Sequence, residues 1–291
     1  MKILLTGSNG QVGKEVKTIS NKFNLELIPM DRSELNITDY SLLDKQIRKH
    51  KPEVIINAAA YTDVENAEEE KKLAELINYK AVKNLAELCK KKSILLIHLS
   101  TDYVFNGLKR SDYLESDNTD PVNTYGRTKL LGEEAIRSIL EQHIIIRTSW
   151  VFGIHGNNFV KKIISLANKE ESLNVISDQF GIPTSAKSIA SALLLISLQY
   201  SKKKHLHYGT YHFSSRPAVS WFSFAKEIIN IAYGEGLINK KITLNKISSK
   251  KFPAKAKRPI RTSLSSKKII DIFNIEITPW KEDLREMLAS L

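Results

Sequence analysis

The chain has 291 residues with 42% hydrophobic and 26% charged content and a formal net charge of +12, a composition typical of a folded globular protein of about two domains. A chain of this length buries on the order of 75% of its unfolded surface, and its single cysteine, Cys89, excludes an intramolecular disulfide and any multi-cysteine metal site. No stretch approaches the roughly 18 consecutive apolar residues of a membrane span, and residues 1–5 lack the features of a signal peptide, so we expect a cytoplasmic protein without membrane contact.

Short apolar segments alternate with helical patterns over the first half of the chain. Strands are expected at residues 1–6, 25–29, 54–56, 94–99 and 143–147. Helices are expected between them at residues 11–22, 40–49, 72–90 and 123–140. The strands are apolar enough to be buried on both faces, which is typical of a parallel sheet covered by helices. The sequence therefore predicts an α/β fold built on a doubly wound, Rossmann-like parallel sheet.

The alternation is less regular after Trp150 and predicts a smaller, mixed α/β domain. Helices are expected near residues 157–169, 187–200, 220–232 and 280–290, and short strands near 173–177, 208–213 and 242–247. We expect residues 1–152 to form the sheet domain, with a segment near 155–190 returning to it, and residues 153–291 to form mainly the second domain. Trp221 and Phe222, at the start of a helix, are interpreted as core residues.

A glycine-rich turn joins the first strand to the first helix. Gly7, Gly10 and Gly13 are spaced three apart, with Gln11 and Val12 opening the helix. Glycines in this position allow a tight turn, close approach of the backbone to a pyrophosphate and close packing of helix on sheet, with backbone N–H groups facing the phosphates. The placement predicts a dinucleotide site, and an ordinary glycine-rich turn is the alternative.

The end of the second strand carries two residues that bear on the choice of cofactor. Asp31 stands 24 residues after Gly7, where an acid accepts hydrogen bonds from an adenosine ribose and favours NADH. Arg32 follows at once, and a guanidinium there neutralises the 2′-phosphate of NADPH. The pair leaves the choice between NADH and NADPH open.

Tyr125 and Lys129 are four residues apart in a helical stretch, so both side chains project from one face. A neighbouring ammonium lowers the pKa of a phenol, which then exchanges a proton with a carbonyl oxygen. The same spacing occurs at Tyr79 and Tyr200, but only Tyr125 follows a strand that ends in Ser100-Thr101, at the sheet edge where ligands of open α/β folds bind. Thr101 adds a hydroxyl that can hold the carbonyl oxygen. The sequence predicts that Tyr125, Lys129 and Thr101 act together.

In their order along the chain, these motifs resemble the extended short-chain dehydrogenase/reductases and, within them, the dTDP-4-dehydrorhamnose reductases. The matching stretches run nearly end to end, at residues 57–65, 100–107, 147–153, 178–184, 258–259 and 280–285. The resemblance implies that Thr101, Tyr125 and Lys129 form the catalytic triad, with Tyr125 and Lys129 also touching the cofactor. It implies further cofactor contacts at Gly10, Gln11, Val12, Gly13, Asn36, Ile37, Ala59, Ala60, Thr62 and Tyr103. It implies sugar contacts at Val64, Asp102 and Trp150.

Some positions depart from the family pattern. Asn36 stands where an aspartate is usual near the adenine, Asn106 replaces an aspartate, and Thr262 replaces a serine. Some relatives hold a magnesium ion at a dimer interface with acidic side chains. Glu15 is retained from that set, but Lys187 takes an acidic place, so a cation there would face an ammonium. We therefore expect no metal, and a homodimer stays open.

The positive charge is concentrated in residues 239–268, which hold eleven basic residues and no acid. The remaining chain has 33 of the 44 basic residues against 32 acidic ones, a charge of +1. A solvated loop is one explanation of this segment. Binding of a substrate diphosphate through Arg258, helped by Arg261, is the second. Nucleic-acid binding is the third and the least favoured, since no aromatic stacking pattern accompanies the charge.

The resemblance implies reduction of the C4 ketone of dTDP-4-dehydro-L-rhamnose to dTDP-L-rhamnose by NADPH or NADH, a step of cell-surface polysaccharide synthesis. Tyr125 is expected to protonate the developing alkoxide, Lys129 to hold the nicotinamide ribose, and Thr101 to steady the oxyanion. Tyr103 replaces a glutamate of the related dehydratases, which argues against water elimination. A related sugar-nucleotide 4-ketoreductase or 4-epimerase with another product, and a non-catalytic NADP-binding regulatory subunit, remain the alternatives.

Overall fold

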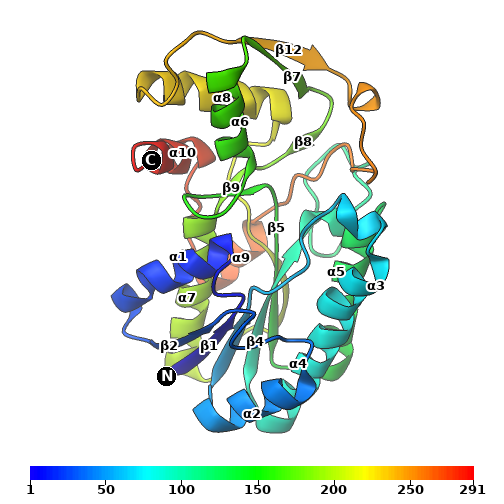
Figure 1. Ribbon diagram of the computed structural model, residues 1–291. Helices are drawn as coiled ribbons and strands as arrows, with labels where there is room; N and C mark the ends of the chain where they lie inside the picture. Colours follow the sequence, from blue (N-terminus) through cyan, green and yellow to red (C-terminus); the bar gives the residue numbers. More distant parts are fainter.

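The computed structural model describes residues 1–291 and contains a six-stranded sheet in which every neighbouring pair of strands is parallel. The strand order is β10-β5-β4-β3-β1-β2 (Figure 1). The strands are β1 (Lys2–Thr6), β2 (Glu26–Met30), β3 (Val54–Asn57), β4 (Leu95–Thr101), β5 (His143–Thr148) and β10 (Gly209–His212). The expected doubly wound parallel sheet is confirmed.

Helices cover both faces of this sheet because its central strands are apolar on both faces. One face packs against α1 (Gln11–Ile19), α7 (Ala186–Lys203) and α9 (Lys267–Phe273). The other face packs against α2 (Tyr40–His50), α4 (Ala81–Lys92) and α5 (Thr124–Ile139). Along β1, Ile3 and Leu5 belong to the first core and Leu4 to the second, which is the alternation that a strand's geometry imposes.

The single helix expected at residues 72–90 is divided by one π-helical turn. It consists of α3 (Lys71–Glu75), the π-helical segment η3 (Leu76–Lys80) and α4. Asn78 lies in that segment, and its buried amide accepts from the Tyr61 N–H at 2.9 Å and donates to the Tyr61 carbonyl at 3.0 Å. The π-helical turn therefore holds the loop that follows β3, where the resemblance implies several contacts.

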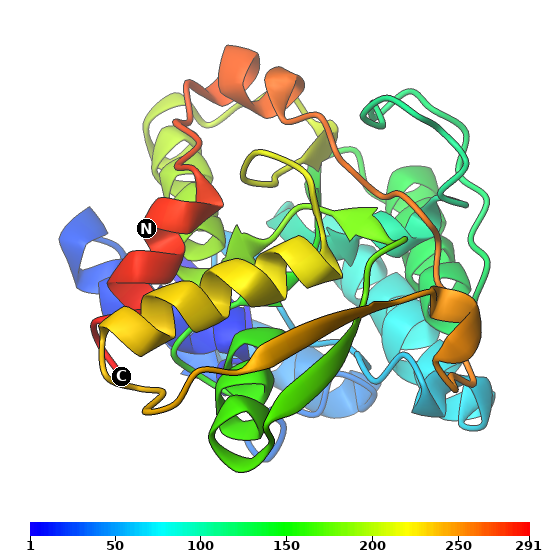
Figure 2. The ribbon, with the colours of Figure 1, turned by 90° about the horizontal axis from the view of Figure 1, so that it is seen from above.

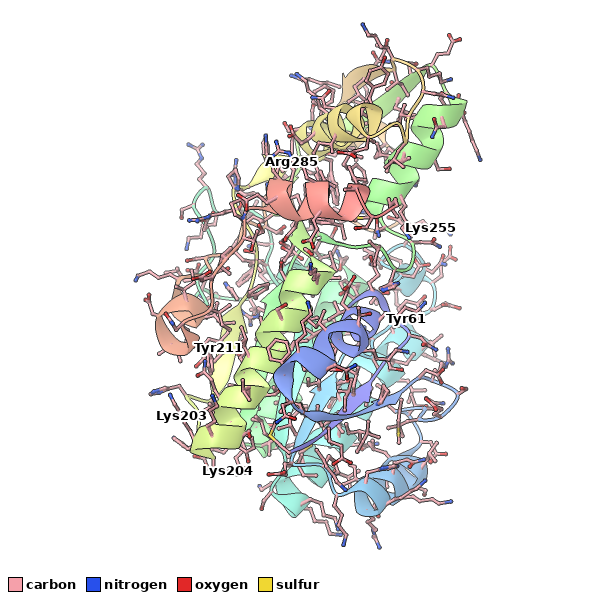
Figure 3. All side chains as sticks on the ribbon, turned by 90° about the vertical axis from the view of Figure 1, so that its left-hand side faces the viewer. Tyr61, Lys203, Lys204, Tyr211, Lys255 and Arg285 are labelled. Carbon is pink, nitrogen blue, oxygen red and sulfur yellow. The ribbon has the colours of Figure 1, made fainter.

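The second domain is built around its own hydrophobic core. It contains α6 (Phe159–Lys169), β7 (Ser172–Ile176), α8 (Trp221–Gly234), β12 (Thr243–Ile247) and α10 (Trp280–Leu288), with β12 parallel to β7. Two further short pairs are formed, β6 (Val151–Phe152) with β9 (Thr184–Ser185) and β8 (Phe180–Gly181) with β11 (Val219–Ser220). Single 3₁₀ turns lie at η1 (Ser20–Phe23), η2 (Asn66–Glu68), η4 (Asp102–Val104) and η5 (Ser249–Lys251). Figure 3 shows the two domains from the side, with Arg285 on α10 in one and Lys203 and Lys204 at the end of α7 in the other.

The chain returns to the sheet later than the expected segment at 155–190. Helix α6 buries one face, with Val160, Ile163 and Ala167, in the core of the second domain. Helix α7 instead buries residues around much of its circumference, including Leu193, Leu194 and Ile196. Such a helix needs covering on several sides, and α1, α9 and the sheet supply it. No helix of the chain combines the length and the apolar character required to span a bilayer.

Candidate active site

The glycine turn and the end of β3 meet where the strand order reverses, between β1 and β3, which is where open α/β sheets bind their ligands. Gly7 has a positive φ of 69°, and a Cβ there would lie 2.6 Å from the backbone nitrogen of Ala59. A Cβ on Gly13 would overlap the carbonyl oxygen of Gly7. Both positions therefore require glycine, and together they leave the backbone open to a ligand.

A pocket of about 240 Å³ opens at this point. Eight of the expected cofactor residues line it: Gly7, Gly10, Asp31, Arg32, Asn36, Ile37, Ala59 and Ala60. Asn9, Leu35, Ala58 and Ile77 complete the lining and were not singled out from the sequence. Helix α1 starts beside the pocket at Gln11, and its N-cap, Gly10, offers no side-chain cap, so the first N–H groups remain available to an anion. The glycine cradle, the pocket and the helix start fit a dinucleotide.

The carboxylate of Asp31 is already engaged by side chains and backbone of its own domain. Its Oδ1 accepts from the Ser33 N–H at 2.8 Å and the Ser33 hydroxyl at 2.6 Å, and its Oδ2 accepts from Asn9 Nδ2 at 2.6 Å. These bonds, the Ser33 hydroxyl above all, lower the pKa of Asp31. Arg32, by contrast, is exposed and makes no ion pair within the chain. The guanidinium of Arg32 is therefore the charged group that remains available to bind a phosphate.

Tyr125 and Thr101 come together at the carboxyl end of β4. Burial raises the pKa of Tyr125 to about 12, and a hydrogen bond with the Thr101 side chain opposes that rise. The ring of Tyr103 packs edge-on against that of Tyr125, with 5.8 Å between the centroids. Helix α5 starts at an Asn123 N-cap, whose Oδ1 accepts from the Gly126 N–H at 2.8 Å and fixes the turn that carries Tyr125. The Tyr125 phenol thus lies close enough to the Thr101 side chain for the latter to affect its pKa.

Lys129 lies one helical turn further on, and its side chain is directed into the sheet. Its Nζ donates to the Leu99 carbonyl at 2.6 Å and lies 3.2 Å from His98 Nε2. Burial lowers the pKa of Lys129 to about 8, while the Glu133 carboxylate opposes this shift. Lys129 is not among the groups that shift the pKa of Tyr125. The mutual effect of Tyr125 and Lys129 stays a prediction.

One helical turn beyond Lys129, on the same face of α5, Glu133 forms a buried ion pair that the sequence patterns did not indicate. Glu133 is fully buried, and Arg147 of β5 donates to it through Nε at 2.9 Å and Nη2 at 2.6 Å. The Ser100 hydroxyl donates to the same carboxylate at 2.5 Å, and Arg137 at 3.0 Å. The two buried charges thus fasten α5 to β4 and β5, the elements that present Tyr125 and Thr101.

Asp102 follows Thr101 and is buried, with Oδ1 accepting from the Thr101 hydroxyl at 3.1 Å. Burial raises the pKa of Asp102 to about 7, and the hydroxyls of Thr262 and Thr101 oppose the rise. Near neutral pH this carboxyl group is therefore partly protonated and can donate as well as accept a hydrogen bond.

Trp150 and Trp221 form a stacked pair where the two domains meet. Their ring centroids lie 3.4 Å apart with only 6° between the planes, and Phe159 packs on Trp221 at 4.5 Å. Trp150 has a positive φ of 44°, unusual for a bulky residue, and its ring lies directly over Gly181. Trp221, which we interpreted as a core residue, is instead only partly buried at the edge of the second core.

The basic segment contacts the sheet domain through two ion pairs. Arg258 forms an ion pair with Glu65, and Lys255 forms one with Glu69 at 2.7 Å. Arg258 also hydrogen bonds to Tyr103, which places its guanidinium near the Tyr125 ring. Figure 2 shows residues 239–260, in orange, crossing from β12 toward α3. Glu65 and Glu69 therefore hold part of the segment against the first domain, while residues 250–255 are exposed, and the solvated loop stays a prediction.

The other expected residues lie around the same edge of the sheet. Val12 is buried in the core under α1, and the Gln11 side chain accepts from Asn158 at 3.0 Å. Thr62 is exposed and Val64 partly exposed in the loop after β3. Lys187 forms an ion pair with Glu286, and burial raises the pKa of the nearby Glu15. Nowhere in residues 1–291 are three or more His, Cys, Asp or Glu side chains grouped so that they could hold a metal ion.

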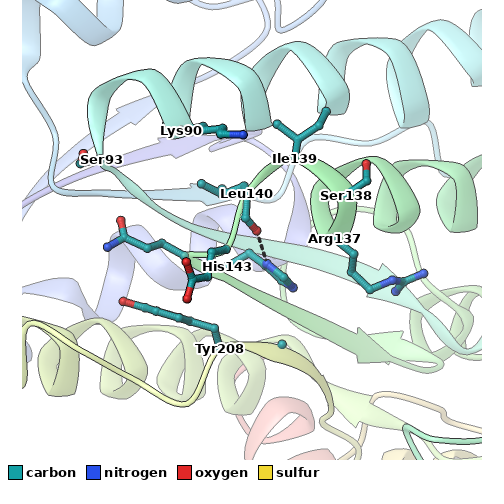
Figure 4. Close-up of a pocket in the computed structure, with 11 residues that line it drawn as sticks. Lys90, Ser93, Arg137, Ser138, Ile139, Leu140, His143 and Tyr208 are labelled. Atoms are coloured by element: carbon teal, nitrogen blue, oxygen red, sulfur yellow. Dashed lines mark hydrogen bonds between the residues drawn. The ribbon is translucent and has the colours of Figure 1, made fainter.

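A larger surface pocket of about 680 Å³ lies at the opposite end of the sheet, lined by Lys90, Arg137, His143 and Tyr208 among others (Figure 4). It adjoins the first residues of β5 and β10 and the last residues of α4 and α5. Basic residues at helix C-termini are accounted for by the helix dipoles. His143 is held by its bond with the Leu140 carbonyl, and no predicted site residue lies there.

A family model, curated relatives and solved structures all match this chain over nearly its whole length. A model of the family described as RmlD substrate binding domain matches residues 1–291. The dTDP-4-dehydrorhamnose reductases of Aggregatibacter actinomycetemcomitans and Escherichia coli are 38% and 35% identical, covering 99% and 100% of this chain and 98% of each relative. The crystal structure of such a reductase from Clostridium acetobutylicum has a TM-score of 0.90 at 36% identity, covering 99% of this chain and 98% of that one. The Bacillus anthracis reductase in complex with NADP has a TM-score of 0.91 at 33% identity, covering 100% of this chain and 99% of that one.

Proposed function

Because the chain belongs to the family of dTDP-4-dehydrorhamnose reductases, as its motifs predict, we propose that it reduces the C4 ketone of dTDP-4-dehydro-L-rhamnose to give dTDP-L-rhamnose. It is an NADPH-dependent oxidoreductase of nucleotide-sugar and polysaccharide synthesis. The observation that carries the proposal is the meeting of Tyr125 and Thr101 beside the buried Lys129, in a chain that matches these reductases from end to end.

The glycine turn and the pocket beside it are the proposed cofactor site. NADPH, when bound, supplies the hydride for the ketone. The N–H groups at the start of α1 would hold its pyrophosphate, and Asn36, Ile37, Ala59 and Ala60 would line the adenosine side. Arg32 is free to hold a 2′-phosphate, whereas the Asp31 carboxylate is engaged within the chain. This difference supports a preference for NADPH over NADH.

Replacing Arg32 by alanine is expected to raise the dissociation constant for NADPH by about tenfold, because a charge-assisted bond to the 2′-phosphate is lost. The affinity for NADH should change little. Quenching of tryptophan fluorescence measures both constants in the absence of substrate. Arg48→Ala, which removes an exposed arginine of α2, is the control and should alter neither. Equal losses of affinity for NADPH and NADH would show that Arg32 does not bind the 2′-phosphate.

Tyr125 is the proposed proton donor to the ketone oxygen. With a pKa of about 12 the phenol keeps its proton in the free protein, so it approaches the carbonyl as an acid. The Thr101 hydroxyl, already bonded to Tyr125, would turn toward the developing alkoxide and stabilise its charge. Lys129, fixed by the Leu99 carbonyl, would bond to the cofactor ribose and restore the proton of Tyr125.

The sugar nucleotide would lie between the two domains. Asp102 can donate or accept a hydrogen bond at a sugar hydroxyl, since its pKa is about 7. Trp150, with Val64 on the other side, would bound the hexose, and Arg258 beside Tyr103 would neutralise part of the diphosphate. The ion pair with Glu65 keeps that guanidinium in place before substrate arrives.

Gly181→Ala is expected to raise KM for the sugar nucleotide by about tenfold, because the new methyl group would overlap the Trp150 ring and an intrusion into a packed contact costs about 1–3 kcal/mol. The affinity for NADPH should be unchanged, since neither Gly181 nor Trp150 lines the cofactor pocket. Gly234→Ala is the matched control, as a Cβ there meets open space. An unchanged KM in Gly181→Ala would remove Trp150 from the substrate site.

The direct test follows the loss of NADPH absorbance with dTDP-4-dehydro-L-rhamnose and identifies the product by NMR. Formation of dTDP-L-rhamnose supports the proposal, whereas a different epimer at C4 would identify another 4-ketoreductase. Absence of oxidation with any 4-keto sugar nucleotide would favour a regulatory subunit.

We also propose a cytoplasmic location, supported by the one cysteine, Cys89, being buried and free. A homodimer stays a prediction for sedimentation analysis.

A further inference from the structure

Four buried polar side chains form a continuous chain across the middle of the sheet. The Thr6 hydroxyl of β1 donates to Asn57 Oδ1 of β3 at 2.6 Å, and Asn57 Nδ2 lies 2.9 Å from His98 Nδ1 of β4. His98 Nε2 then lies 3.2 Å from Nζ of Lys129. Thr6, Asn57 and His98 are 0% exposed and Lys129 is 2% exposed. The chain thus links three adjacent strands to the lysine of the proposed site.

We propose that His98 is a positioning residue that fixes Nζ of Lys129 and couples the protonation of this lysine to the tautomer of the imidazole ring. The inference rests on the proposed function only for the part that Lys129 plays in turnover. The hydrogen-bonding network itself is a property of the free protein.

The orientation of the Asn57 amide is set by a donor that cannot reverse. The backbone N–H of Ala59 donates to Asn57 Oδ1 at 3.3 Å, and this oxygen also accepts from Thr6. The amide nitrogen therefore faces His98 Nδ1, which must accept. A neutral imidazole that accepts at Nδ1 carries its proton on Nε2. In this arrangement His98 donates toward Lys129.

A donor at His98 Nε2 favours the neutral amine of Lys129, because an ammonium has no lone pair with which to accept. The ammonium of Lys129 requires an unprotonated Nε2 on His98, and the neutral ring then carries its proton on Nδ1. The Asn57 amide must reverse to accept from that Nδ1–H, which turns its own N–H₂ group toward the Ala59 N–H. The charged groups that face Lys129 are few. Glu133 lies one turn along α5, where Arg147 and Arg137 pair with it, while β1 and β3 contribute only neutral Thr6 and Asn57. The network therefore opposes the ammonium, in agreement with a lysine pKa near 8.

This coupling suits a lysine that must take up and return a proton. With a pKa of about 8, Lys129 is a stronger acid than the Tyr125 phenol, whose pKa is about 12, so return of a proton to the phenolate is more favourable than from a lysine with an ordinary pKa. When Lys129 is neutral, the Nε2–H tautomer bonds to its amine and the Asn57 amide keeps the orientation seen here. No unpaired donor is then left in the buried site, where one would be costly.

The first test observes the ring nitrogens of His98 directly in the protein labelled with ¹⁵N-histidine, without substrate. The signal is assigned by its absence in His98→Gln. We expect the Nδ1–H tautomer at pH 6 to give way to Nε2–H by pH 10, following the ionisation of Lys129. In Lys129→Met the ring should be Nε2–H throughout. A single tautomer at all pH values in the parent protein would overturn the coupling, whatever the enzyme's substrate proves to be.

The second test compares pH profiles of kcat/KM in two variants. In His98→Gln the amide oxygen can accept from the ammonium and no tautomer has to change, so the limb that reports Lys129 should move up by about one pH unit, the size of one hydrogen bond to a single protonation state. His143→Gln removes another buried histidine, at the far end of the sheet, and should leave the profile unchanged. A lower melting temperature in His98→Gln with an unmoved profile would show that His98 is merely structural.

Discussion

Tyr125→Phe is expected to lower kcat by about two to four orders of magnitude while binding of NADPH stays close to that of the parent protein. The substitution removes a single oxygen atom, and with it the proton that the ketone oxygen needs as it takes up charge. The ring remains to pack against Tyr103, whose centroid lies 5.8 Å away, so the local structure should be kept. Steady-state kinetics at saturating cofactor and substrate measure the loss.

The chain offers a matched control for this experiment. Tyr79 stands four residues before Lys83, the same spacing as Tyr125 and Lys129, but it lies in the π-helical segment η3. Tyr79→Phe should leave turnover unchanged, because the Tyr79 hydroxyl makes no hydrogen bond to Thr101 or Lys129. Activity of Tyr125→Phe close to that of Tyr79→Phe would refute the assignment of the proton donor.

Glu133→Ala is expected to reduce the free energy of unfolding by about 3–5 kcal/mol, the usual cost of removing one partner of a buried ion pair. The loss is large because Arg147, only 2% exposed, would keep its charge without a counter-ion. Urea denaturation followed by circular dichroism measures the change. Activity should fall as well, since α5 would lose its attachment to β4 and β5.

An exposed ion pair supplies the comparison. Glu87 lies 4.0 Å from Lys83 on the surface of α4, and Glu87→Ala should change the stability by less than about 1 kcal/mol. The double variant Glu133→Met, Arg147→Met removes both buried charges and should recover much of the stability lost in Glu133→Ala. If Glu133→Ala were as mild as Glu87→Ala, the buried pair would not be what holds α5 in place.

The fold of the first domain was predictable because its signals are local. Ile3 to Leu5 and Val54 to Ile56 are apolar on both faces, and each strand is followed by a helical pattern of the right length, so a parallel sheet is the arrangement that buries them all. The glycine turn and Tyr125 were predictable for the same reason. Each depends on a spacing of a few residues that fixes the geometry directly.

The residues that the sequence did not reveal depend on partners far away in the chain. Glu133 meets Arg147 only because α5 lies on β5, and Trp221 meets Trp150 only because the domains close on one another. His98 left one usable signal, as a lone histidine within the apolar run of β4. Its role depends on Asn57 and Lys129, which no local pattern connects to it. The packing of α7 against the sheet was not predicted, because the apolar faces of this helix show that it is buried but not which elements bury it.

The position of β10 at one edge of the sheet has a consequence for synthesis on the ribosome. Strand β10 pairs in parallel with β5, but its residues emerge some 60 positions later, after α6, β7 and α7. A nascent chain that ends near residue 150 would therefore expose the backbone of β5 as an unpaired edge, a hazard for association with other chains. Truncation after the first domain should consequently give aggregates, and native assembly has to wait until translation has passed the closing strand.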